Sequence, residues 1–261
     1  MKKIKFTKMV GSGNDFVVIS GKPSGDLSKL AKVLCNRKFG IGADGLLWLD
    51  KCPGADLRMR IFNADGSEAE MCGNGARCAA FYHGKPKSRL LTLAGIIEAE
   101  VSGDKVKVQL TPPREIRLDI PLMINGKLLK VNFIDTGVPH VVIFVNGIDG
   151  IEVKHLGQII RHHEAFLPRG ANVNFVEEKG RNFIRIRTYE RGVEDETLAC
   201  GTGSTAAALI FALKNNLNKI IKVQTQSGQL LKVSFRKEGS EFKKVWLEGE
   251  VRVVYKGEYY V

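Results

Sequence analysis

The sequence contains the stretch MCGNG at residues 71–75 and a matching stretch, ACGTG, at residues 199–203. Their cysteines, Cys72 and Cys200, are 128 residues apart, which is close to half of the 261-residue chain. Small residues follow each stretch, ARCAA after the first and STAAA after the second, and they favour a helix that packs closely against its neighbours. We infer that one structural unit occurs twice in the chain.

Other stretches repeat in the same order at nearly the same separation. The matches are DFVVI (15–19) with HVVIF (140–144), ADGLL (43–47) with ANVNF (171–175), and RIFN (60–63) with RTYE (187–190). Ordered matches of this kind predict two homologous α+β halves related by a pseudo-twofold axis. We place their junction near Pro112 and Pro113, so that residues 1–112 carry Cys72 and residues 113–249 carry Cys200.

Apolar periodicity predicts four helices and a larger number of strands. The predicted helices are 27–35, 75–83, 155–164 and 203–215. The predicted strands are 16–19, 46–49, 57–62, 105–110, 141–145, 174–176, 183–189, 222–225, 230–235 and 245–254. The last helix is apolar nearly all round, so we expect it to be buried.

The chain carries 40 Lys and Arg against 28 Asp and Glu, a formal net charge of +12. Because the basic residues are spread along the chain, we interpret them as a solvated surface and expect no nucleic-acid partner. No apolar run of about 18 residues occurs, which predicts no membrane partner. No apolar segment follows the basic start, so we expect no signal peptide and a cytoplasmic location.

The chain has five cysteines, at positions 35, 52, 72, 78 and 200. An odd number in a chain of this length argues against a secreted disulfide framework. Since there is no C-x-x-C pair and no His at zinc-ligand spacing, we expect no metal site.

The repeated cysteines indicate acid–base chemistry. Each precedes a predicted helix, whose N-terminus favours a thiolate and offers backbone N–H groups to a carboxylate. A thiolate on one side of a bound amino acid would remove the Cα proton, and a thiol on the other side would supply one. The pattern therefore predicts cofactor-free racemisation or epimerisation of an amino acid. The alternative is that Cys72 and Cys200 only pack at the starts of their helices.

Seven motifs allow comparison with a known family. They are KMVGSGNDF (8–16), FNADGS (62–67), CGNGARC (72–78), GVPH (137–140), GANVN (170–174), YERG (189–192) and CGTG (200–203). By these motifs the sequence resembles the diaminopimelate epimerase family over nearly its whole length. The resemblance implies an isomerase that converts LL-2,6-diaminopimelate to the meso form without cofactor or metal, in lysine and peptidoglycan synthesis. It also implies a homodimer, a curved β-sheet or barrel around a central helix in each half, and a last strand at 250–261 that returns to the first half.

The resemblance also implies roles for individual residues. Cys72 and Cys200 would be the general acid and base. The remaining roles are carboxylate binding by the backbone of Gly73, Asn74, Gly201 and Thr202, substrate binding by Asn14, Asn63, Asn172 and Arg191, and placement of the amino group by Glu190 and His140. Arg191 would be the bidentate partner of the distal carboxylate. Taken singly, Asn63 also fits a turn residue, His140 a loop residue, and the Glu190–Arg191 pair surface charge.

Two positions depart from the family pattern. Val138 stands where many members have Asn, and Gly45 where many have Gln; the loop between Arg191 and Cys200 is also one residue longer. These differences leave open another amino-acid racemase on the same scaffold. A non-catalytic or polyanion-binding protein is a third interpretation. We also expect oxidation to join the two repeated cysteines when the site is empty.

Overall fold

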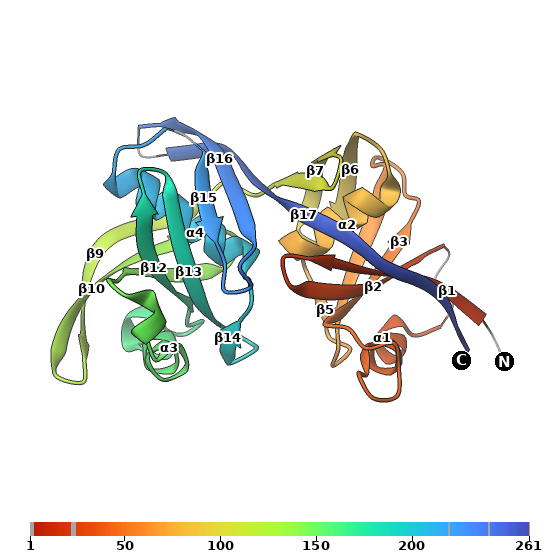
Figure 1. Ribbon diagram of the computed structural model, residues 1–261, viewed down its shortest axis with the longest axis horizontal. Coiled ribbons are helices and arrows are strands. Elements are labelled where there is room, and N and C mark those ends of the chain that lie inside the picture. The colour runs from red at the N-terminus through yellow and green to blue at the C-terminus, as the bar shows by residue number, and fades with distance from the viewer. Residues whose placement is uncertain (1–2, 22–24, 219, 240, 261) are drawn as a thin grey trace. The chain divides into compact units, whose positions relative to one another are not determined.

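The computed structural model describes residues 3–21, 25–218, 220–239 and 241–260 (Figure 1). The chain divides into two compact units, one of residues 1–109 with 248–261 and one of residues 110–247. The expected first half and the expected last strand include residues 1, 2, 22–24 and 261, which lie outside the described residues.

The first unit is a closed mixed sheet with two helices. Its elements are β1 (Lys3–Gly11), β2 (Asn14–Ser20), α1 (Leu27–Cys35), β3 (Gly45–Asp50), β4 (Leu57–Asn63), β5 (Glu68–Ala69), α2 (Gly73–His83), β6 (Lys87–Thr92), β7 (Gly95–Ser102), β8 (Lys105–Gln109) and the last part of β17 (Glu241–Tyr260). The strands pair in the order β17–β1–β2–β3–β4–β6–β7–β8, and β8 pairs with β17 again. The sheet of this unit therefore forms a barrel, with parallel pairing at β2–β3 and β4–β6.

The second unit repeats this topology. Its elements are β9 (Arg114–Ile124), β10 (Lys127–Asp135), β11 (Pro139–Phe144), α3 (Val153–Arg161), β12 (Asn172–Gly180), β13 (Phe183–Glu190), β14 (Asp195–Thr197), α4 (Gly201–Lys214), β15 (Ile221–Gln224), β16 (Leu230–Glu238), the start of β17, and short 3-10 helices at Ile148–Gly150 and Glu164–Phe166. The order is β9–β10–β11–β12–β13–β15–β16, and the parallel pairs, β11–β12 and β13–β15, correspond to those of the first unit. The predicted α+β fold with a repeated unit is confirmed.

One small-residue helix lies at the centre of each sheet (Figure 1). Helix α2 packs against β1, β2, β3, β4, β6, β7 and β8, and α4 packs against β10, β11, β12, β13, β15 and β16. The close approach requires the small side chains seen in the sequence. A Cβ on Gly75 would lie 3.0 Å from a methyl carbon of Leu47, which is tighter than ordinary van der Waals contact.

The structure contains all four predicted helices and a strand at each predicted strand position. Three helices begin two residues earlier than predicted, at Gly73, Val153 and Gly201, and α3 ends at Arg161 instead of residue 164. Strands β1, β5, β6, β7, β9, β10 and β14 were not predicted from the sequence. Of these, β9 is largely exposed, so it lacks the apolar alternation by which a half-buried strand is recognised.

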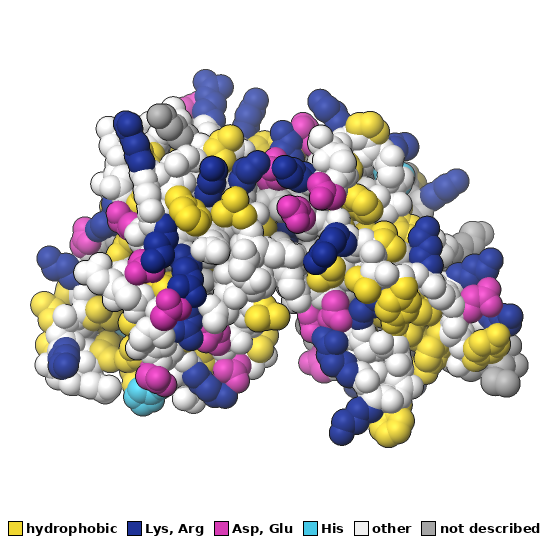
Figure 2. All heavy atoms as spheres, viewed as in Figure 1, with side chains coloured by type: hydrophobic (Ala, Val, Ile, Leu, Met, Phe, Trp, Pro, Cys, Tyr) yellow, Lys and Arg dark blue, Asp and Glu magenta, His cyan; other side chains and the backbone are white. Residues whose placement is uncertain are grey.

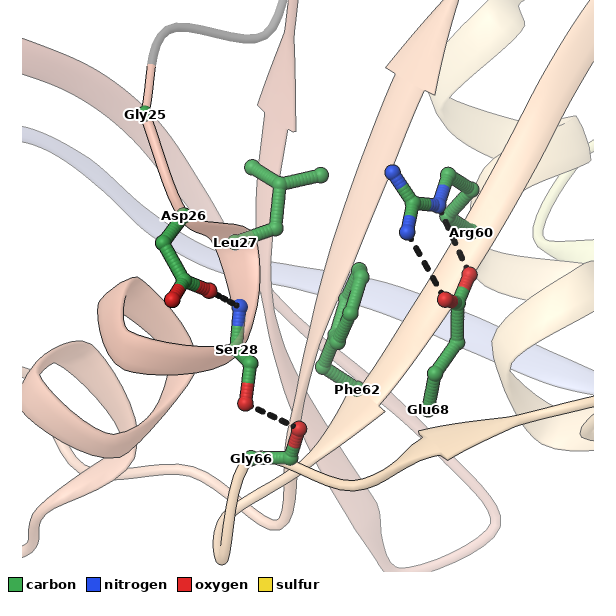
Figure 3. Close-up of a pocket in the computed structure, with 8 residues that line it drawn as sticks. All are labelled: Gly25, Asp26, Leu27, Ser28, Arg60, Phe62, Gly66 and Glu68. Atoms are coloured by element: carbon green, nitrogen blue, oxygen red, sulfur yellow. Dashed lines mark hydrogen bonds and ion pairs between the residues drawn. The ribbon is translucent and has the colours of Figure 1, made fainter.

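A bidentate ion pair is repeated along with the fold. Arg60 on β4 donates Nε and Nη2 to the two carboxylate oxygens of Glu68 on β5, both at 2.7 Å (Figure 3). Arg187 on β13 donates to Glu196 on β14 in the same way, also at 2.7 Å. Each pair ties the short strand that leads to a repeated cysteine onto the longer strand before it. Arg187 additionally donates to the carbonyl oxygens of Ile148 and Ile151, each at 3.0 Å.

The surface charge is mixed. Lys and Arg side chains are spread over the visible face of both units, with Asp and Glu among them (Figure 2). Several are paired, for example Lys154 with Asp195 at 2.6 Å and Lys214 with Asp119 at 2.8 Å. In the described part of the chain, no helix has both the length and the apolar character needed to cross a membrane.

The two repeated ion pairs predict unequal stability losses. The Arg187 side chain is 13% exposed and that of Arg60 is 36% exposed. We expect Arg187→Met to lower the free energy of unfolding by about 2–3 kcal/mol, because it leaves several part-buried acceptors unbonded. The matched Arg60→Met should cost about 1 kcal/mol or less. Urea unfolding of both variants measures the difference, and a larger loss from Arg60→Met than from Arg187→Met would contradict the expected order.

Candidate active site

Cys72 is the N-cap residue of α2 in the first unit. Its backbone is extended, with φ −140° and ψ 121°, and its Sγ accepts a hydrogen bond from the backbone N–H of Gly75 at 3.5 Å. The half-buried side chain therefore lies at the positive end of the helix, where a thiolate is favoured.

Cys200 has the same position on α4 in the second unit. Its φ and ψ are −118° and 114°, and its Sγ accepts from the backbone N–H of Gly203 at 3.4 Å. The side chain is buried, and the hydroxyl of Thr202 lies 3.4 Å from the sulfur. The local geometry of the two cysteines is therefore duplicated, as the repeated sequence predicts.

A hydrogen-bond network joins Asn74 and Asn14 in the first unit. The buried Asn74 amide donates Nδ2 to Oδ1 of Asn14, whose own Nδ2 donates to Asp44 at 3.2 Å. The turn between β1 and β2 is thereby held against the start of α2. Of the substrate-binding residues predicted in this unit, Asn14 and Asn74 are brought together beside Cys72.

Arg77 completes this network from the next turn of α2. It is a fully buried cation whose Nη2 donates to Oδ1 of Asn74 and, at 2.9 Å, to the hydroxyl of Ser12. Its Nε and Nη1 have no hydrogen-bond partner among the described residues. Burial lowers the pKa of Arg77, while the neighbouring thiols Cys78 and Cys72 act in the opposite direction when charged. The guanidinium thus adds positive charge to the helix end that carries Cys72.

Asn63 is not part of this network. It is the exposed last residue of β4, next to a turn, where its Nδ2 donates to the Ser67 hydroxyl at 2.9 Å and its backbone N–H donates to the Ser67 carbonyl at 2.8 Å. Asp65 accepts from the Ser67 backbone N–H in the same turn, at 2.8 Å. These contacts agree with the alternative interpretation of Asn63 as a turn residue.

In the second unit, Asn172 and Arg191 are joined directly. Asn172 accepts the backbone N–H of Arg191 at 2.8 Å and donates to the Pro139 carbonyl at 3.2 Å. His140 on β11 is register partner to Asn172 on the parallel strand β12. The Arg191 guanidinium is half-buried and donates to the Arg169 carbonyl at 3.2 Å. The predicted residues of this unit therefore gather at one end of β11, β12 and β13.

Glu190, the last residue of β13, accepts a hydrogen bond from the Thr197 hydroxyl at 2.9 Å. Burial raises the pKa of the Glu190 carboxyl above its usual value, although the hydrogen bond from Thr197 opposes the shift. A carboxyl group in such surroundings is suited to exchange a proton or a hydrogen bond with a polar ligand.

His140 is completely buried and uncharged. Burial, aided by the charge of Arg191, lowers the pKa of the imidazole to about 3. Its Nδ1 lies 3.1 Å from Nδ2 of Asn174, whereas its Nε2 has no hydrogen-bond partner among the described residues. His140 is therefore neutral at physiological pH.

Two of the other three cysteines, Cys35 and Cys78, are buried and only weakly acidic. Burial raises the pKa of the Cys35 thiol to about 11 and that of Cys78 to about 12, so both thiols stay protonated at neutral pH. Cys78 is fully buried inside α2 and Cys35 ends α1. Both are packing residues.

The two departures from the family pattern lie in different surroundings. A Cβ on Gly45 would lie 2.9 Å from the Phe62 carbonyl oxygen, so a longer side chain there requires a backbone shift. Val138 is half-buried in the turn between β10 and β11, where its carbonyl accepts the Thr136 backbone N–H at 3.1 Å. The Gly45 site therefore cannot accept a larger residue without local rearrangement.

A separate pocket of about 490 Å³ opens at the start of α1 (Figure 3). Its lining residues are Gly25, Asp26, Leu27, Ser28, Arg60, Phe62, Gly66 and Glu68. None of these was predicted as a site residue. Two charged side chains of the lining, Arg60 and Glu68, are already paired with each other. Within the described ranges, no group of three or more His, Cys, Asp or Glu is arranged to hold a metal ion.

Several residues of the hydrogen-bond networks around the predicted ones were not themselves predicted from the sequence. Among them are Ser12, Arg77, Asn174 and Thr197. Ser12, Arg77 and Asn174 lie inside the quoted motifs and are buried. A polar residue within such a motif is the feature of the sequence that could have marked them as part of the site. For Thr197, on the short strand β14, the sequence offers no comparable signal.

Comparison with known proteins decides the family. The family model for diaminopimelate epimerase matches residues 6–116 and 132–254. The chain belongs to the diaminopimelate epimerase family. It is 44% identical over 274 residues to the diaminopimelate epimerase of Aquifex aeolicus, with 97% of each chain covered. It is 43% identical over 279 residues to that of Methanocella arvoryzae, covering 99% of this chain and 97% of the relative.

The fold also resembles that of solved structures. A phenazine biosynthesis protein of the PhzF family from Bacillus anthracis matches with a TM-score of 0.77 and 17% identity, over 100% of both chains. At this identity the likeness concerns the fold alone. The resemblance inferred from the motifs is confirmed, and with it the expectation of an enzyme of the isomerase class.

The buried His140 predicts a pH-dependent stability. Between pH 6.5 and about 3 the unfolded chain binds a proton that the folded chain does not, because the folded pKa is about 3. The contribution of the neutral His140 to the free energy of unfolding is therefore fully present above pH 6.5. It is lost as the pH decreases, by up to about 5 kcal/mol near pH 3.

Urea unfolding across this pH range measures the effect. His140→Gln should reduce the slope of the free energy of unfolding against pH. His155→Gln, at an exposed position, should leave that slope unchanged. An unchanged slope in His140→Gln would show that this imidazole is not the group responsible.

Proposed function

We propose that the chain is a diaminopimelate epimerase that interconverts LL- and meso-2,6-diaminopimelate without a cofactor. Family membership supports the reaction, and the duplicated cysteine geometry supports the mechanism. The observation that carries the proposal is that Cys72 and Cys200 both cap a helix, with Sγ accepting a backbone N–H at 3.5 and 3.4 Å.

In the proposed reaction, the thiolate of one cysteine removes the Cα proton and becomes a thiol. The electron pair left on Cα delocalises into the neighbouring carboxylate, and the thiol of the other cysteine donates its proton to the opposite face of Cα. The stereocentre is inverted, and the two sulfurs have exchanged protonation states. The reverse reaction uses the same groups in the opposite order.

The substrate carboxylate next to Cα would accept hydrogen bonds from the first turns of both helices. The donors would be backbone N–H groups of Gly73, Asn74, Gly201 and Thr202. Fixed dipoles of this kind stabilise the charge that develops on the carboxylate when the proton leaves.

The rest of the substrate would be held by groups outside the helix starts. Asn14, Asn63, Asn172 and Arg191 are the proposed binding residues, with Glu190 and His140 at the reacting centre. Arg191 suits the distal carboxylate because a guanidinium donates two parallel hydrogen bonds to such a group. Since Asn63 already bonds within its own turn, its binding role requires the Ser67 contact to be exchanged.

A second candidate is a racemase for another amino acid. It is favoured by Val138 and Gly45, where the side chains common in the family are replaced. A cytoplasmic location, a homodimer and a role in lysine and peptidoglycan synthesis are part of the main proposal.

Proton NMR in D₂O tests the reaction directly. With LL-diaminopimelate, reducing agent and no added cofactor, we expect deuterium at Cα together with appearance of the meso isomer. Exchange with another amino acid but not with diaminopimelate would favour the second candidate. No exchange with any amino acid would contradict both and favour a binding protein.

Substitution of the cysteines separates the mechanism from the fold. Cys72→Ser and Cys200→Ser should each lower kcat/KM by at least about 100-fold, because a serine hydroxyl is a far weaker acid than a thiol and supplies almost no anion at neutral pH to act as the base. Cys78→Ser is the matched control on the same helix and should keep activity if the protein folds. Circular dichroism checks the fold, and full activity in Cys72→Ser would overturn the two-thiol mechanism.

Oxidation tests whether the two sulfurs come close together. We expect mild oxidant to inactivate the substrate-free enzyme by linking Cys72 to Cys200, since a disulfide forms only when the Cα atoms approach within about 7 Å. Peptide mapping identifies the link, bound substrate should prevent it, and dithiothreitol should restore activity. Persisting activity with the two cysteines unlinked would refute this expectation.

A further inference from the structure

Three buried side chains on adjacent strands form a network beside the start of α4. They are His140 on β11, Asn174 on β12 and Thr188 on β13. Asn174 Nδ2 lies 2.9 Å from the Val141 carbonyl oxygen and 3.1 Å from His140 Nδ1. The Thr188 hydroxyl donates to Asn174 Oδ1 at 3.0 Å.

The network also contacts the helix that follows Cys200. A Cβ added at Gly203 would collide with Oδ1 of Asn174. The same Gly203 donates its backbone N–H to the sulfur of Cys200. Asn174 therefore lies directly against the helix turn that holds the second cysteine, and glycine is required at that contact.

The hydrogen bonds determine the orientation of the Asn174 amide. A carbonyl oxygen can only accept, so the amide atom facing Val141 must be the NH₂ group. The amide oxygen then faces Thr188, whose hydroxyl can donate to it. The second N–H of the same NH₂ group is directed at His140 Nδ1.

This orientation leaves one tautomer for His140. Nδ1 must accept the Asn174 N–H, so Nδ1 carries no proton. The neutral ring then carries its single proton on Nε2. That atom is buried and has no protein partner among the described residues, so it is a donor without an acceptor.

We propose that Asn174 is a positioning residue that fixes His140 as the neutral Nε2–H tautomer, so that His140 acts in the reaction as a hydrogen-bond donor and not as a base. The statement about the reaction rests on the proposed function; the statement about the tautomer does not.

The proposal changes the role expected for His140. An Nε2–H group bonds to an acceptor such as a carboxylate oxygen, whereas a substrate ammonium group offers only donors. His140 in this state can therefore donate a hydrogen bond to a carboxylate oxygen. The positive charge of Arg191, which acts on the same ring, also favours a carboxylate there. Placement of the amino group falls to acceptors such as Glu190.

Nitrogen NMR of the resting enzyme tests the tautomer. With ¹⁵N-labelled histidine, long-range proton–nitrogen correlations distinguish protonated from unprotonated ring nitrogens, and His140→Gln identifies the signals of His140. We expect Nε2 to be protonated and Nδ1 unprotonated, unchanged from pH 8 to pH 5. A proton on Nδ1, or a doubly protonated ring at pH 6, would overturn the proposal.

Asn174→Asp tests whether Asn174 is the cause. A carboxylate at this place accepts instead of donating, so Nδ1 should become protonated. The change of protonation should lower kcat by at least about 10-fold, since a wrong histidine tautomer can cost far more. An Asn174→Asp enzyme with the original tautomer, or with the new state and unchanged kcat, would also contradict the proposal.

Asn132→Asp is the matched control. Asn132 is likewise buried, donates its Nδ2 to the Val142 carbonyl at 3.1 Å, and bonds no histidine. Its substitution should cause a similar loss of stability but leave the His140 signals unchanged. If Asn174→Asp does not fold, the signals of the unaltered enzyme still decide the tautomer. Failure of the epimerase assay with the expected tautomer would count against the proposed function alone.

Discussion

The hydrogen bond from a backbone N–H in the first helical turn to the sulfur of the preceding cysteine is the interaction on which both units depend. It forms at Cys72 and at Cys200 with nearly equal length, 3.5 and 3.4 Å. It requires an extended cysteine and a helix that begins at a fixed residue, and in both units the residue that donates is a glycine. The closed sheet of the first unit and the short strands β5 and β14 serve to fix that starting point.

The surroundings of the two sulfurs are similar in plan but different in chemistry. In the first unit the strand turn reaches the helix through Asn14 and Asn74, with the buried cation Arg77 behind them. In the second unit the corresponding contact is made by the Thr136 hydroxyl, which donates to the Thr202 carbonyl at 3.2 Å. Both units therefore tie the strand turn to the helix start, but the donor lies on the helix in the first unit and on the turn in the second, and the buried cation Arg77 belongs to the first unit.

The sequence predicted the features that depend on local pattern or on exact repetition. Both cysteine loops, the four helices and the repeated topology follow from such signals. Strand β9 was not predicted, because its largely exposed residues show no periodic apolar pattern. The starts of α2 and α4 were placed two residues late, since glycine at positions 73 and 201 is a poor helix former away from its cap. The contacts of Asn174 with His140 and of Arg77 with Ser12 join side chains that are far apart in the sequence, so no local spacing predicts them.

Strand β17 has a consequence for how the molecule is made. Its last residues pair with β1, from Val251 opposite Gly11 to Tyr260 opposite Lys3, and complete the barrel of the first unit. A ribosome therefore delivers the beginning of that barrel long before the strand that closes it. The second unit, residues 110–247, is contiguous, so its synthesis is finished before that of the last part of β17. Although domains usually mature in the order of their synthesis, here the first unit cannot close its barrel until β17 has been synthesised.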